Sequence, residues 1–85
     1  MDYVVVAFRS RAHTVKFYEA LKMNGIGAEI INTPKEAGVG CGLSVKVKKE
    51  NLFSVRRAVN ALSLASFAGI FSVNSLGSKR IVKSI

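Results

Sequence analysis

An α+β fold, in which two helices cover one face of an antiparallel sheet, is predicted by the order of apolar patterns along the 85 residues. Apolar β-branched runs and period-two alternation indicate strands, and two stretches with helical spacing lie between them. The resulting order is strand, helix, strand, strand, helix, strand. A chain of this length encloses one core, so we expect a single domain over residues 1–85.

The first strand and the first helix are predicted in residues 3–24. Residues 3–8 are apolar on both alternating faces, which is typical of a central strand. Ser10 is a candidate N-cap for a helix that starts at Arg11, and Asn24-Gly25 ends it because glycine readily adopts the left-handed conformation. The face of this helix that we expect in the core carries Thr14, Phe17, Tyr18 and Leu21.

The rest of the chain completes the pattern. A short strand at residues 28–31 is followed by a loop at residues 32–40 that contains the only proline. In the third strand Leu43, Val45 and Val47 alternate with Ser44, Lys46 and Lys48, which predicts one buried face and one basic, wet face. Asn51 is the expected cap of the second helix, residues 67–73 form a fourth strand, and residues 79–85 form either a tail or an edge strand.

This order is that of a ferredoxin-like βαββαβ sandwich, whose first strand is central and antiparallel to the third. The end of the first strand therefore lies beside the beginning of the third. We expect the residues Ser10 to His13, which open the first helix, to lie next to Gly40-Cys41-Gly42. Pro34 and Lys35, in the loop between the second and third strands, are expected at the same end of the sheet.

Cys41 is the candidate reactive residue because it lies between two glycines and not in an apolar run. Exposed backbone N–H groups favour an anion such as a thiolate, and a helix N-terminus contributes about 0.3–1 kcal/mol. Lowering the thiol pKa from about 8.5 to about 7 takes roughly 2 kcal/mol, so a cation must contribute. Arg11, Lys35 and protonated His13 are the candidates, and a buried, unreactive cysteine is the alternative.

Most enzyme classes lack their signature residues in this chain. A Cys41–His13 pair is one way to activate a thiol, but no third residue is identified that would orient the histidine, which disfavours a hydrolase. The sequence has no phosphate-binding glycine loop followed by lysine, no carboxylate pair and no metal-ligand cluster. We therefore expect a non-catalytic protein without a metal or another bound cofactor.

The chain is basic, with 13 Lys and Arg against 5 Asp and Glu and a net charge of +8. This balance favours anions in general, and Lys46, Lys48, Arg56 and Arg57 are the candidate contacts. We expect weak, nonspecific binding to nucleic acid. An RNA-binding or protein-interaction module remains the alternative function, although the central strands offer few aromatic side chains on which bases could stack.

Two motifs resemble the selenium/sulfur (Se/S) carrier protein-like family. They are Phe8-Arg9-Ser10 before a helix that ends in Asn24-Gly25-Ile26, and Thr33-Pro34-Lys35-Glu36 followed by Cys41-Gly42-Leu43. The resemblance spans about half the chain, from Tyr3 to Val47. It implies that Cys41 carries sulfur or selenium as a covalent persulfide-type adduct. Enzymes that donate and accept sulfur or selenium would then be the partners.

Three expectations concern the surroundings of the protein. The start of the chain does not read as a signal peptide, so the cytoplasm is the default location. Residues 58–78 carry no charge, but polar residues and glycines interrupt them, so no membrane span is expected. Tyr3, Val5 and Ala7 would form an apolar strip on the uncovered face of the sheet, which favours a homodimer over a monomer covered by its own tail.

Overall fold

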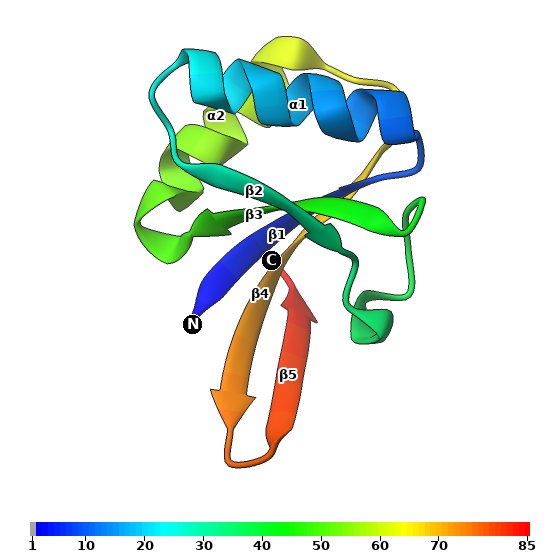
Figure 1. Cartoon of the computed structure of the whole chain (residues 1–85), viewed down its shortest axis with the longest axis vertical. Coiled ribbons are helices and arrows are strands. Elements are labelled where there is room, and N and C mark those ends of the chain that lie inside the picture. The colour runs from blue at the N-terminus through cyan, green and yellow to red at the C-terminus, as the bar shows by residue number, and fades with distance from the viewer. Residues whose placement is uncertain (1) are drawn as a thin grey trace.

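A computed structural model describes residues 2–85, in which two α-helices pack on a five-stranded sheet (Figure 1). The predicted α+β fold is confirmed, and residues 79–84 form an edge strand. Within these residues no helix combines the length and the apolar character that a membrane crossing requires. The elements in chain order are β1 (Tyr3–Phe8), α1 (Arg11–Met23), β2 (Ala28–Asn32), the 3₁₀ helix η1 (Lys35–Ala37), β3 (Leu43–Lys48), the 3₁₀ helix η2 (Lys49–Asn51), α2 (Leu52–Leu62), β4 (Phe67–Leu76) and β5 (Lys79–Ser84).

The sheet is antiparallel throughout, with the strand order β2-β3-β1-β4-β5. β1 is the central strand, as predicted, and it pairs with β3 from Tyr3↔Lys48 to Ala7↔Ser44. Because the two strands run in opposite directions, the C-terminal end of β1 lies beside the N-terminal end of β3. The loop that carries Cys41 therefore meets the start of α1 at one end of the sheet.

The main core lies between the helices and one face of the sheet. Val4, Val6 and Phe8 of β1 point into it and are almost completely buried. The Phe8 ring lies 5.2 Å from the ring of Phe17 on α1 and 5.9 Å from that of Phe67 on β4. Full burial of a side chain of this size stabilises the fold by about 1.5–3 kcal/mol, so Phe8 fixes the end of β1 where the Cys41 loop is attached.

The two helices begin in different ways. Ser10 caps α1 as predicted, because its Oγ accepts a hydrogen bond from the His13 N–H at 3.2 Å. Asn51 occupies the N-cap position of α2, as predicted, but its side chain makes no capping hydrogen bond. The η2 turn leads the chain into α2 instead, and the Leu52 N–H donates to the Lys49 carbonyl.

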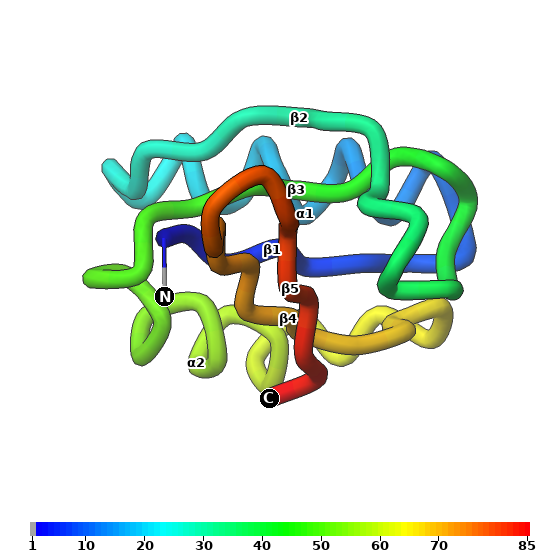
Figure 2. Tube along the Cα trace, turned by 90° about the horizontal axis from the view of Figure 1, so that it is seen from below, coloured from blue at the N-terminus to red at the C-terminus, as the bar shows by residue number. Residues whose placement is uncertain are grey.

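The β4–β5 hairpin bends away from the helices and passes across the other side of the sheet (Figures 1 and 2). Val5 and Ala7, which point to this second face, are fully buried within the single chain. Phe71 lies opposite Val5 in the β1–β4 register and is itself 7% exposed. The strip on which we based the dimer is therefore mostly covered by the chain itself, and the homodimer stays a prediction.

We predict that Phe71→Ala lowers the free energy of unfolding by about 3 kcal/mol, because it removes a buried aromatic side chain from the second face. Urea unfolding followed by circular dichroism measures this loss. A matched Phe53→Ala variant should change stability little, since Phe53 is 72% exposed on α2. Equal losses in the two variants would show that Phe71 does not cover the sheet.

Candidate functional site

The Cys41 loop is attached to the end of β1 by its backbone. The Cys41 N–H donates to the Phe8 carbonyl at 3.0 Å. Gly40 and Gly42, on either side, have φ angles of 97° and 94°, which L-residues with side chains rarely adopt. A Cβ on Gly40 would also lie only 3.2 Å from the Phe8 carbonyl oxygen. Glycine at position 40 therefore allows the loop to approach β1 closely.

Hydrogen bonds close the loop at its base. The Thr33 N–H donates to the Gly42 carbonyl at 2.9 Å, and the hydroxyls of Thr33 and Ser44 are 2.6 Å apart. Ser44 is fully buried, so its prediction as a wet residue of β3 is wrong. The reason is that the chain folds back at Thr33 and satisfies the hydroxyl of Ser44 internally. Pro34 is buried, and Lys35 is exposed and lines a shallow depression with Gly40 and Gly42.

The sulfur of Cys41 points toward the first turn of α1 and is half-buried. Its Sγ lies 3.7 Å from the Thr14 hydroxyl and 3.6 Å from the Leu43 carbonyl oxygen. In the protonated form the S–H donates to this carbonyl. The Thr14 hydroxyl also reaches the Ser10 carbonyl at 3.1 Å, so it can turn between a backbone acceptor and the sulfur.

The pKa of the Cys41 thiol lies below its ordinary value because favourable contacts outweigh burial. Partial burial by itself raises this pKa. Hydrogen bonds donated to the sulfur by the backbone of Leu43 and by the hydroxyl of Thr14 favour the thiolate and lower the pKa, and the nearby positive charge of Arg11 lowers it further. The site therefore increases the fraction of the nucleophilic thiolate near neutral pH.

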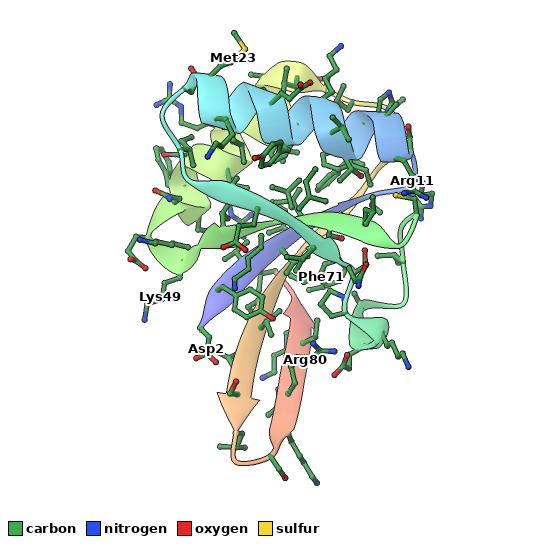
Figure 3. All side chains as sticks on the ribbon, viewed as in Figure 1. Asp2, Arg11, Met23, Lys49, Phe71 and Arg80 are labelled. Atoms are coloured by element: carbon green, nitrogen blue, oxygen red, sulfur yellow. The ribbon has the colours of Figure 1, made fainter. Side chains whose placement is uncertain are left out.

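Arg11 and His13, the residues predicted to assist Cys41, lie in different surroundings. Arg11 is exposed at the start of α1, at the Cys41 end of the sheet (Figure 3). The Nδ1 of His13 lies 2.6 Å from the Ser66 hydroxyl, so the histidine is engaged with the segment before β4 and not with the sulfur. Within residues 2–85, no group of three or more His, Cys, Asp or Glu side chains is arranged to hold a metal ion.

The four candidate anion contacts do not form one surface. Lys46 and Lys48 alternate with core residues of β3 and point to the second face of the sheet, where the Lys46 ammonium lies 4.5 Å from the centre of the Tyr3 ring. Arg56 and Arg57 are exposed on α2, which packs on the opposite face. Weak binding to nucleic acid stays a prediction, and these four residues offer no single continuous track for it.

Sequence reasoning missed Thr14 and Ser66 as parts of this region. Thr14 was predicted only as a core residue, and it is indeed fully buried. A hydroxyl within an otherwise apolar helix face is a signal that could have identified it, because a buried hydroxyl needs a partner. Ser66 precedes β4 and carries no comparable signal. The carbonyls of Phe8 and Leu43 are backbone groups, whose direction depends on the folded loop.

The family described as "Putative Se/S carrier protein-like" matches residues 2–66. This match covers more than half of the chain, so the protein belongs to that family, as its two motifs had indicated. The matched residues include α1, the Cys41 loop and β3, but not the β4–β5 hairpin. No curated protein and no solved structure matches the chain. The family description names a carrier, which fits a non-catalytic role.

We predict that Gly40→Ala destabilises the protein more than Gly42→Ala. Both substitutions force a side chain into a left-handed conformation, which costs about 1–3 kcal/mol. Only a Cβ at position 40 also approaches the Phe8 carbonyl, whereas one at position 42 meets nothing within 4 Å. Thermal unfolding compares the two variants, and equal losses would contradict the close approach of the loop to β1.

We also predict that Thr14→Val slows alkylation of Cys41 at pH 7, whereas Thr14→Ser preserves the rate. Valine retains the shape of threonine but removes the hydroxyl that lowers the thiol pKa, so the thiolate fraction falls. Iodoacetamide rates measured from pH 5 to 10 separate the pKa from the intrinsic reactivity. An unchanged pKa in Thr14→Val would contradict the role of this hydroxyl.

Proposed function

We propose that this protein is a non-catalytic carrier in which Cys41 holds sulfur or selenium as a persulfide-type adduct. The observation that carries the proposal is the position of the Cys41 sulfur, which is half-buried beside the Thr14 hydroxyl and has a lowered pKa. Membership of the Se/S carrier-like family supports the same reading. Cys41 is also the only cysteine of the chain, so no second thiol can resolve the adduct into an internal disulfide.

Loading requires a donor that already holds a sulfane sulfur, such as an enzyme with a cysteine persulfide. The Cys41 thiolate attacks the outer sulfur of the donor, the sulfur–sulfur bond of the donor breaks, and a new bond forms on Cys41. The donor leaves as a thiolate, and the proton of the outer sulfur stays with the transferred atom. Transfer therefore involves no net oxidation. Selenium follows the same path when it is the outer atom.

Unloading is the reverse attack by the thiolate of an accepting enzyme on the outer atom of the adduct. The Thr14 hydroxyl lies 3.7 Å from the Sγ atom of Cys41, and the positive charge of Arg11 acts on the same sulfur. These contacts also make Cys41 a better leaving group, because a lower thiol pKa speeds its departure.

We predict that protein purified without reductant, or treated with a low-molecular-weight persulfide, gains the mass of one sulfur or one selenium atom. Intact-mass spectrometry before and after dithiothreitol detects the adduct and its release as the free thiol. Cys41→Ser should keep the fold and never gain this mass, because it lacks the sulfur nucleophile.

An outcome that would refute the carrier role is a Cys41 that reacts rapidly with iodoacetamide but forms no adduct with any persulfide donor. The residue would then be a reactive thiol with another purpose. A Cys41 that stays inert until the protein unfolds would instead favour the protein-interaction alternative, in which the residue is a structural cysteine.

A further inference from the structure

Three exposed cations lie in segments of the chain that meet at the Cys41 end of the sheet. Arg9 directly follows Phe8, whose carbonyl accepts the Cys41 N–H. Arg11 begins α1, and its charge acts on the Cys41 thiol. Lys35 begins η1 and lines the depression formed with Gly40 and Gly42. The segments that carry these three residues meet at Cys41, and we define Arg9, Arg11 and Lys35 as its positively charged rim.

None of the three rim residues forms an ion pair within residues 2–85. Among residues 2–85 the only ion pair joins Arg80 of β5 to Glu36 of η1, at 2.8 Å. Glu36 is the one acidic residue of the Cys41 loop, and its carboxylate accepts two hydrogen bonds from the Arg80 guanidinium. The other four acidic residues lie elsewhere, in the segment before β1, in α1, in β2 and in η2; they are Asp2, Glu19, Glu29 and Glu50.

We infer that the sulfur- or selenium-transfer partner is a protein that presents an acidic surface around its reactive cysteine. This inference rests on the carrier function proposed above. The rim charges come from the β1–α1 connection, from the first position of α1 and from η1, so a protein surface can meet all three, whereas a single small anion would meet fewer. Complementary charge raises the rate of encounter and orients the two sulfur atoms before transfer.

The test uses three synthetic peptides, each with one cysteine joined to 2-nitro-5-thiobenzoate by a disulfide. The cysteine is flanked by Asp and Glu in the first peptide, by Ser in the second and by Lys in the third. The Cys41 thiolate attacks the peptide sulfur, the original disulfide breaks, and the coloured thiobenzoate leaves as a thiolate. Its absorbance reports the rate of transfer to Cys41.

We predict that the acidic peptide reacts about tenfold faster than the serine peptide at low salt, and that the lysine peptide is the slowest. The differences should shrink as salt shortens the range of the electrostatic attraction. Equal rates for the three peptides would overturn the inference. An activated disulfide of glutathione that reacts as fast as the acidic peptide would overturn it too, because a small anion would then suffice.

Arg11→Glu should remove the preference for the acidic peptide, and Lys22→Glu provides the matched control. Both are exposed cations of α1, but they lie 11 positions apart along the helix. This spacing corresponds to roughly 16 Å, well beyond the Debye length at physiological salt. If Lys22→Glu removes the preference equally, the net charge of the protein is responsible and the rim is not. Arg9→Glu and Lys35→Glu test the other two rim positions in the same way.

Iodoacetamide separates this inference from the proposed function, because it is neutral and its rate reports the thiolate fraction and intrinsic reactivity of Cys41 without attraction to the rim. Each peptide rate is divided by the iodoacetamide rate of the same variant, which removes any change in the pKa of Cys41. A preference for the acidic peptide in a protein that forms no persulfide adduct would contradict the carrier role and support the acidic partner. A persulfide adduct without a preference among the peptides would support the carrier role and contradict the acidic partner.

Discussion

The hydrogen bond from the Cys41 N–H to the Phe8 carbonyl is the constraint on which the candidate site depends. It attaches a glycine-rich loop to the central strand. The Phe8 ring packs against Phe17 and Phe67, which holds the backbone of Phe8 in place. With the backbone held there, the cysteine side chain projects toward the first turn of α1. Core packing on one side of β1 thereby determines the surroundings of a sulfur atom at its end.

Those surroundings balance two opposing effects. Partial burial of the Cys41 sulfur disfavours the thiolate and raises its pKa, whereas hydrogen bonds and a nearby charge favour the thiolate and lower its pKa. The backbone of Leu43, the Thr14 hydroxyl and the Arg11 charge compensate for burial, and the last two come from the first turn of α1, which Ser10 caps. The capped helix therefore does more than complete the core, because it also supplies the groups that favour the charged sulfur.

The sequence predicted the elements well because their signals are local. Periodicity identified both helices, and the strand order followed from their succession, which also brought Ser10 and Cys41 to one end. The burial of Ser44 could not be predicted, because it follows from how the loop folds back at Thr33. The pairing of His13 with Ser66 and the coverage of Val5 by the hairpin likewise depend on contacts between distant parts of the chain.

The central claim is that the fold holds Cys41 with a pKa below that of a free thiol. Because the chain has a single cysteine, ¹³C labelling of cysteine Cβ gives one signal, and its chemical shift can be followed by NMR across the pH range. We predict a midpoint clearly below about 8.5 in the native protein and a return to about 8.5 in urea. A native midpoint at or above the urea value would contradict this account of the site.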